Sequence, residues 1–598
     1  MKLYRYILLL GALAVTSCDL DEFPQDKLAP ENYFNNEAEL RTFTNTFYQQ
    51  NLPTAESIYS ETADLIVCTT LSKEVAGTRV VENDGGGWTT GSWNPLTYIN
   101  HYLYYSHRCK DAKARAHYDG VARFFRAYFY FEKVKRFGDV PWYDTPVGSA
   151  DPALYKARDS REYVMEKVLE DIDFAIDNLP TAPDVYNVTK WTALALKSRI
   201  CLFEGTFRKY HGLEGGDDFL QACADASEKF ITSSPYDIYN TGSSPYRDLF
   251  SAKNATSTSK EVILARDYDK GQSVVHNINM YALSTTYGMP GVTKKMVDSY
   301  LMADGTRFTD QPNYGTMGFY MEMQNRDPRL TQTVRGPKYT RIGGTETLGP
   351  DFACSHTGYN LTKWVGDASQ DGYNNSYNDI ILFRSAEVYL NFAEAKAELG
   401  TLTQSDIDKS IKKLRDRVGM PNLNMEAANL NPDPYLASPV TGYANVTGAN
   451  KGVILEIRRE RAVELIAEGF RYYDMVRWKE GKRFENEIEG MYFAPIKDGE
   501  TWRVYDMDGD GKNSAMDICL YTNAKPEIDG VKTYYKIGEK FRLTGENGGN
   551  VIVHDTATEP RQWREDRDYL YPIPLSQILL SNGKVKQNPH WDENQSLK

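Results

Sequence analysis

The stretch DMDGDGKNSAMD carries carboxylates at the spacing of a calcium-binding loop. Counted from Asp506, they fall at positions 1, 3, 5 and 12, and Gly511 at position 6 permits a tight turn. The predicted ligands are Asp506, Asp508, Asp510, Lys512 through its backbone carbonyl, Ser514 directly or through a water, and Asp517. Asp replaces the usual Glu at the last position, which shortens the bidentate arm. We expect a lone structural calcium loop; the alternative is a polar Asp-Gly turn without an ion.

A second group of residues could bind sugars. Sugar rings present C–H faces that stack on flat aromatic rings, and their hydroxyls are bound by amides, carboxylates and guanidinium groups. Trp88 follows three glycines in GGGWTTGSW, so we expect it to lie in a loop outside the core, whereas Trp93 and Tyr98 approach helical spacing and favour a packing role. The predicted ligand-binding residues are Trp88, Arg79, Asn83, Asp84 and Tyr287.

The segment EIRRERAVELIAEGFRYYDMVRW is dense in charge, and its carboxylates beside arginines could suggest acid–base chemistry. Residues of opposite charge recur at i,i+3, however, where helical side chains meet. The pairs are Glu456/Arg459, Arg461/Glu464, Glu468/Arg471 and Asp474/Arg477. We therefore predict structural ion pairs and no catalytic residues in this helix.

Motifs of common enzymes are absent from the sequence: it contains no H-E-x-x-H, no G-x-S-x-G and no P-loop. A glycosidase needs only two suitably placed carboxylates, and the chain has 82 Asp and Glu residues. The sequence therefore favours a protein that is not an enzyme and leaves a surface glycosidase open.

The N-terminus has the pattern of a lipoprotein signal. Lys2 and Arg5 precede a short apolar run that ends in Val15-Thr16-Ser17-Cys18, and this run is too short for a ~20-residue membrane helix. We predict a signal peptide over residues 1–17 and acylation of Cys18, which would anchor the chain to a membrane. The alternative is an ordinary secretory signal with a cysteine near its end.

Composition narrows the remaining classes. The 598-residue chain has a formal charge of −13 and no stretch dense in Lys and Arg, which argues against nucleic acid as a partner. The six cysteines after Cys18 form no C-x-x-C pair, so a zinc ribbon or thioredoxin-type site is not expected, and disulfide pairing stays open.

Hydrophobic periodicity predicts a mostly α fold: a tetratricopeptide-like helical hairpin scaffold with a loop-rich subdomain carrying short strands. Helices are predicted over residues 121–137, 191–210, 218–234, 381–400, 405–419 and 452–481. The loop-rich stretches are 235–375, 421–450 and 485–560. We divide the chain into a signal peptide (1–17), an N-terminal helical region (18–234), a loop-rich region (235–375) and a C-terminal region (376–598).

Several phrases, in their order along the chain, resemble the SusD/RagB family of outer-membrane lipoproteins. They are FFRAYFYFEKVKRFGDVPWYDTP, ILFRSAEVYLNFAEAKAELG, IRRERAVELIAEGFRYYDMVRW and YLYPIPLSQILLSNGKVKQNPHW. The resemblance implies a tetratricopeptide-containing fold, a lipid anchor facing the cell exterior, an oligosaccharide ligand and a SusC-type TonB-dependent outer-membrane transporter as partner. It implies no catalytic residues. Peptide cargo, as in the RagB branch, is the alternative; a glycosidase or a pure adhesin is less favoured.

Overall fold

The computed structural model describes residues 33–591 apart from 149–150, 539, 555 and 557. The predicted signal peptide and Cys18 lie outside the described residues. Within the part described, no helix combines the length and apolar character needed to cross a bilayer.

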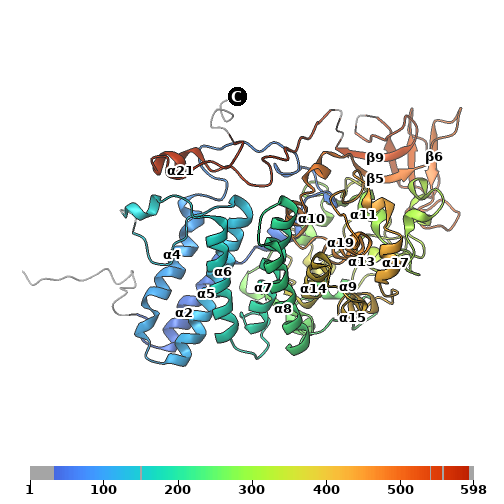
Figure 1. Ribbon diagram of the computed structural model, residues 1–598. Coiled ribbons are helices and arrows are strands. Elements are labelled where there is room, and N and C mark those ends of the chain that lie inside the picture. The colour runs from blue at the N-terminus through green and yellow to red at the C-terminus, as the bar shows by residue number, and fades with distance from the viewer. Residues whose placement is uncertain (1–32, 149–150, 539, 555, 557, 592–598) are drawn as a thin grey trace, which may run out of the picture.

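A row of helices with roughly parallel axes forms the scaffold (Figure 1). Its members are α2 (Glu37–Asn51), α4 (Thr90–Tyr105), α5 (Ala112–Phe137), α6 (Arg161–Asn178), α7 (Lys190–His211), α8 (Gly216–Ser233) and α14 (Ser385–Leu399). α5 packs on α6 and α7 packs on α8 as antiparallel hairpins, and α8 also contacts α14. The predicted hairpin scaffold is confirmed.

The α7–α8 hairpin shows how the sequence determines this packing. Thr189 caps α7 in a capping box with Thr192, and Gly212 ends the helix in the left-handed conformation, with φ 71° and ψ 31°. A Cβ on Gly205 would lie 2.8 Å from the Leu220 side chain and 2.9 Å from the Gly216 carbonyl oxygen. Only glycine allows this approach, so Gly205 sets the distance between the two helices.

Three predicted helices are interrupted. The helix predicted over 405–419 divides at Ser410 into α15 (Gln404–Lys409) and α16 (Ile411–Asp416). The helix predicted over 381–400 begins as strand β4 (Ile380–Arg384), which pairs antiparallel with β2 (Val262–Arg266), and becomes helical only at Ser385. A short, fully buried apolar run is compatible with a strand and with a helix, and hydrophobic periodicity cannot distinguish the two. The helix predicted over 452–481 divides into α19 (Lys451–Leu465) and α20 (Arg471–Arg477), because the chain turns at Ala467, where φ is 60°.

Most of the remaining segments form short elements at the other end of the molecule, whereas α21 (Leu575–Leu580) lies above α4 (Figure 1). The short helices are α3 (Ala55–Tyr59), α9 (Pro245–Ser251), α10 (Ile278–Leu283), α11 (Lys294–Ser299), α12 (Phe319–Glu322), α13 (Arg329–Thr333), α15 (Gln404–Lys409), α16 (Ile411–Asp416), α17 (Met425–Leu430), α18 (Pro434–Ala437) and α21 (Leu575–Leu580). The other strands are β1 (Ile66–Val67), β3 (Gly291–Val292), β5 (Ile488–Phe493), β6 (Trp502–Tyr505), β7 (Ile518–Tyr521), β8 (Thr533–Lys536) and β9 (Gly549–His554). This is the predicted loop-rich subdomain with short strands.

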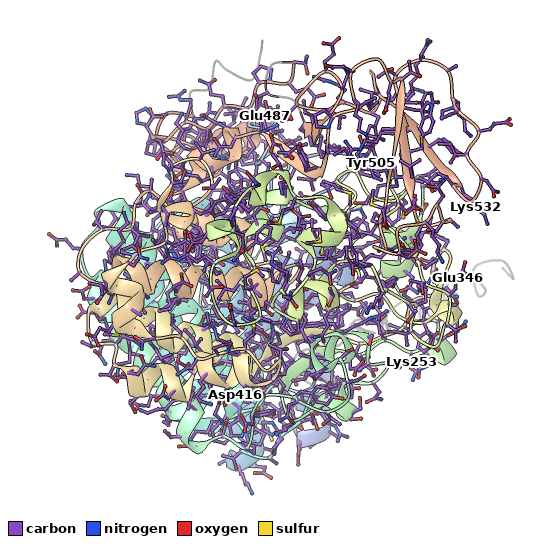
Figure 2. All side chains as sticks on the ribbon, turned by 90° about the vertical axis from the view of Figure 1, so that its right-hand side faces the viewer. Lys253, Glu346, Asp416, Glu487, Tyr505 and Lys532 are labelled. Carbon is purple, nitrogen blue, oxygen red and sulfur yellow. The ribbon has the colours of Figure 1, made fainter. Side chains whose placement is uncertain are left out.

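These strands form small sheets. β1 pairs with β3 and β5 with β9, both antiparallel, while β7 lies between antiparallel β6 and parallel β8. The sheet of β6, β7 and β8 stands at the outer edge, where Tyr505 and Lys532 are seen in Figure 2. A continuous apolar core connects the scaffold with most of this subdomain.

Two distant segments cross the top of the molecule together in Figure 1, and we call them the strap (residues 60–88 and 561–591). The backbone N–H groups of Leu575 and Ser576 donate to the carbonyl oxygens of Glu82 and Asn83. The strap thus holds a segment from the N-terminal part of the chain and a segment from the C-terminal part together above the helices.

Candidate ligand-binding cleft

A cavity of about 280 Å³ opens where the loop-rich subdomain meets the strap, and we call it the polar cleft. β5, β9 and α11 contribute to its walls, together with loops from four other parts of the chain. Its lining includes Asp64, Val75, Lys294, Lys295, Asp298, Tyr314, Tyr435, Val440, Thr441, Arg483, Phe484, Asn486, Glu487, Glu489 and Asn550. The lining residues therefore come from segments that lie far apart in the sequence.

Two half-buried tyrosines form an aromatic wall of the polar cleft. The ring centroids of Tyr314 and Tyr435 lie 6.3 Å apart with their planes at 86°, and Tyr314 also packs edge-on against Phe308 at 6.0 Å. The Tyr435 hydroxyl donates to the Lys295 carbonyl oxygen at 3.3 Å. These contacts hold both rings in place, so the wall is formed before any ligand arrives.

Polar groups around the polar cleft are held by neighbours of their own. Asn550 Nδ2 donates to Glu489 Oε2 at 2.6 Å, and Asn486 Nδ2 donates to the Val440 carbonyl oxygen at 2.8 Å. Glu487 is exposed at the rim, where Figure 2 labels it. The cleft thus presents amide and carboxylate groups beside the aromatic wall, the combination that binds hydroxyl-rich molecules.

A buried ion cluster forms the floor. Lys294 Nζ lies 3.1 Å from Asp298 Oδ1 and 2.8 Å from Glu322 Oε1, and the Tyr359 hydroxyl donates to Glu322 Oε2 at 2.6 Å. Burial raises the pKa of Asp298 to about 7, and nearby Glu322 acts in the same direction, although Lys294 opposes both. One ammonium group thus faces two carboxyl groups in the floor, which disfavours an anionic ligand.

Trp88 was predicted to lie in a loop outside the core, and this prediction was wrong because the side chain is buried. The side chain is 4% exposed and packs edge-on against Phe137, with ring centroids 4.8 Å apart, and against Trp93 at 5.4 Å. It belongs to the core and lines a separate cavity beneath α21.

Cations of α5 explain this burial. Lys133 Nζ donates to the Gly87 carbonyl oxygen at 2.7 Å, and Arg136 Nε donates to the Gly86 carbonyl oxygen at 2.7 Å. Gly86 and Gly87 both have positive φ, which turns their carbonyl groups toward the helix. The glycines therefore fold the loop onto α5 and bury the tryptophan that follows them.

Arg79, also predicted to bind ligand, is 8% exposed. Its guanidinium donates to the Asp568 carbonyl oxygen and lies 4.7 Å from the Tyr571 ring centroid and 5.4 Å from that of Trp563. The structure places Arg79 between the two segments of the strap and away from open surface.

The other predicted ligand-binding residues do not meet at one site. Asn83 and Asp84 are exposed on the strap, whereas Tyr287 is half-buried and donates to Glu56 Oε1 at 3.1 Å. None of the five predicted residues lines the polar cleft. Among the residues that do, Tyr314 and Tyr435 gave no sequence signal beyond their location in loop-rich stretches.

The predicted calcium loop brings three of its four acidic residues together, and the fourth, Asp517, lies outside this cluster. Asp506, Asp508 and Asp510 each offer a carboxylate oxygen, and these oxygens lie within 4.8 Å of one another. Asp517 is buried and turned inward, where Oδ2 accepts from the Ser514 N–H at 2.8 Å. Burial raises the pKa of Asp517, and the charges of Asp506 and Asp508 raise it further. This donor set fits calcium, whose binding would relieve the repulsion.

The charge-dense segment is structural, as predicted, although only part of its pairing is local. Glu456 pairs with Arg459 at 3.0 Å and Asp474 with Arg477 at 2.9 Å. The predicted pairs Arg461/Glu464 and Glu468/Arg471 are wrong, since their members bind distant partners instead. The observed pairs are Arg461 with Asp474, Glu464 with Arg384 and Arg417, Glu468 with Lys363 and Arg384, and Arg471 with Asp64. The six described cysteines are free thiols.

The fold and the polar cleft define a helical-hairpin scaffold that carries a loop-built cavity. The SusD family model matches residues 260–591, and a second model, described as starch-binding associating with outer membrane, matches residues 20–202. The chain belongs to the SusD family.

Individual relatives agree with this assignment. SusD-like protein P2 of Formosa agariphila is 23% identical over 514 residues, covering 82% of this chain and 92% of the relative. A SusD-like protein of Bacteroides fragilis has a structure similar to this one at a TM-score of 0.68, with 21% identity over 95% of this chain and 100% of the other. A second B. fragilis structure, described as a SusD-like carbohydrate binding protein, aligns at a TM-score of 0.66 with 19% identity, covering 92% and 99%.

Proposed function

We propose that this protein captures oligosaccharides at the cell surface and delivers them to a SusC-type TonB-dependent outer-membrane transporter. The observation that carries the proposal is the polar cleft, in which two fixed tyrosine rings face amide and carboxylate groups. The family's description as starch-binding and associated with the outer membrane, and a carbohydrate-binding neighbour of the same fold, support it.

The mechanism is binding without turnover. Sugar rings stack on Tyr314 or Tyr435, while the Asn486 amide oxygen and the Glu489 carboxylate accept hydrogen bonds from the hydroxyls. Because these groups are already positioned, little conformational entropy is lost when a sugar binds. Lys294 pairs with both Asp298 and Glu322 of the floor, and we assign these carboxylates a structural role.

Acylation of Cys18 would retain the protein at the outer membrane, facing the cell exterior. Fourteen residues separate Cys18 from Tyr33, where the described chain begins. Calcium in the loop over Asp506–Asp517 would fix the turn before β7.

Affinity electrophoresis through gels containing α-glucans, β-glucans, xylans or mannans tests the proposal. The wild-type domain should be retarded in at least one gel without releasing reducing ends. Tyr314→Ala and Asn486→Ala should weaken this retardation at least tenfold, whereas Tyr163→Ala, which changes a tyrosine 42% exposed on α6, should not.

The outcomes separate the alternatives. Release of reducing ends would identify an enzyme. Absence of retardation in every gel, together with binding of a peptide mixture, would identify peptide cargo. Unchanged retardation of both cleft variants would exclude the polar cleft as the sugar site.

A further inference from the structure

A second cavity, of about 130 Å³, is lined by residues of α4 and α21. We call it the aromatic pocket. Its lining includes Trp88, Trp93, Asn94, Leu96, Thr97, Asn100, Pro141, Tyr143, Tyr155, Lys156, Gln577 and Leu580. It shares no lining residue with the polar cleft. In Figure 1, α21 lies above α4 at one end of the molecule, and α11, which lines the polar cleft, lies toward the other end.

Aromatic rings form the walls of the aromatic pocket and are fixed by contacts with one another and with neighbouring groups. Trp93 packs edge-on against Tyr143, with centroids 6.2 Å apart and planes at 85°, and against Phe129 at 5.6 Å. The Tyr143 hydroxyl donates to the Leu154 carbonyl oxygen at 2.8 Å. Tyr155 lines the pocket from the adjoining 3-10 turn Pro152–Tyr155. The pocket is therefore a preformed aromatic surface.

The polar groups of the aromatic pocket are almost all uncharged. Asn94 and Thr97 are exposed at its rim on α4, and Gln577 reaches it from α21. The single ionised residue of the lining, Lys156, pairs with Asp159 at 2.6 Å, and its Nζ lies 5.4 Å from the Tyr143 ring centroid. An ionic ligand would find no free countercharge here, whereas a neutral molecule with C–H faces and hydroxyl groups matches the rings and amides.

We infer that the aromatic pocket is a second saccharide subsite, which takes a single neutral sugar ring. At about 130 Å³ it has less than half the volume of the polar cleft, so it takes one ring where the polar cleft takes a chain. The inference rests on the proposed function for the source of the sugar. Two separate subsites on one chain would let a polymer be held at two points, which raises its apparent affinity through effective concentration.

Tryptophan fluorescence reports on this pocket, because Trp88 and Trp93 line it. Trp563 packs on Phe484 of the polar cleft, with ring centroids 5.4 Å apart, so variants of the pocket are needed to assign the change. The mature domain is titrated with glucose, xylose and mannose and with gluco-, xylo- and manno-oligosaccharides. A saturable change in emission is expected for at least one of them. Tyr155→Ala and Asn94→Ala should weaken it at least fivefold, because both side chains line the pocket.

Tyr163→Ala is the matched control, and Asn486→Ala in the polar cleft should leave the emission change intact. No emission change with any of these sugars, or a change that persists in both Tyr155→Ala and Asn94→Ala, would overturn the inference. If retardation by polysaccharide persisted in that case, the proposed function would still stand. Loss of retardation in the cleft variants without loss of the emission change would support two independent subsites.

Discussion

Replacing Glu464 by Gln should destabilise the whole protein, because this carboxylate connects three buried arginines. It is 0% exposed, and Arg417 Nη2 lies 2.6 Å from both of its oxygens. Arg384 Nη1 donates to it at 2.8 Å and Arg329 Nη1 at 3.0 Å. Gln has nearly the same shape but removes the negative charge and one acceptor, leaving arginines of three distant segments partly uncompensated.

The magnitude follows from this burial. Removing one partner of a buried ion pair costs about 3–5 kcal/mol, since it leaves a desolvated charge behind. An unfolding entropy of about 2.1 cal/mol/K per residue corresponds to about 1.2 kcal/mol/K for a chain of this length, so a loss of about 4 kcal/mol lowers Tm by about 3 °C. Glu228→Gln is the control: its partner Lys409 lies 3.4 Å away at a surface where the two side chains are 49% and 42% exposed. It should change Tm by less than about 1 °C.

The pH dependence distinguishes loss of charge from loss of packing. Burial would raise the pKa of Glu464, but Arg417, Arg384 and Arg329 hold it well below its usual range. The stability that this carboxylate contributes is fully present above about pH 4.5 and is lost as pH falls below it. Calorimetry should therefore find the wild-type and Gln proteins converging in Tm as pH falls below 4.5. Equal Tm values at pH 7, or a difference that does not narrow in acid, would refute this account of the network.

Three further predictions concern other parts of the chain. Calcium at about 100 times its Kd should stabilise the protein by about 2.7 kcal/mol. Calorimetry should show a rise in Tm for wild type and none for Asp506→Asn. If calcium does not raise the Tm of wild type, the acidic loop is a turn without an ion. Cys18→Ala should leave the protein uncleaved or soluble, so recovery of normal amounts in the membrane fraction would disprove the anchor. Because burial raises the pKa of Asp298 to about 7, the native state binds its proton more tightly than the unfolded state, and stability is lost as pH rises from about 4 to 7. The Asp298→Asn variant has no carboxyl group to titrate and should not lose stability in this way. Urea unfolding should therefore show its free energy of unfolding rising relative to that of wild type between about pH 4 and pH 7. A difference that stays constant with pH would contradict the raised pKa of Asp298.

The helical scaffold was predictable because its signals are local. Periodic apolar residues, the cap at Thr189 and the glycine that ends α7 act within one or two helical turns, and α7 and α8 appear where the pattern places them. The strand at Ile380–Arg384 was missed for the opposite reason. Its pairing partner, Val262–Arg266, lies more than a hundred residues earlier, and nothing in the five apolar or cationic residues reports that partner.

The buried ion pairs of α19 and α20 were likewise predictable only where both partners lie in the same helix. The helical repeat correctly predicted that the acidic and basic residues of α19 and α20 form ion pairs, and the two pairs that stay within one helix were identified. Glu464 and Glu468 instead face Arg384, at the end of β4. A buried carboxylate binds whichever cation the tertiary fold brings to it, and spacing along one helix carries no information about that cation.

Trp88 explains why the ligand-binding residues were the least predictable part of the protein. Three glycines before an aromatic residue indicate a loop, and a loop usually lies at the surface. Here the same glycines adopt positive φ and turn carbonyl groups toward Lys133 and Arg136, so hydrogen bonds to a neighbouring helix outweigh the exposure typical of a loop. The indole of Trp88 therefore lines the aromatic pocket, where a ligand would contact it together with Trp93 and Tyr155. Glycine content thus predicts that the backbone can adopt many conformations, but not which one it adopts. Lys133 and Arg136, about fifty residues further along the chain, bind the glycine carbonyl groups and thereby determine which way Trp88 faces.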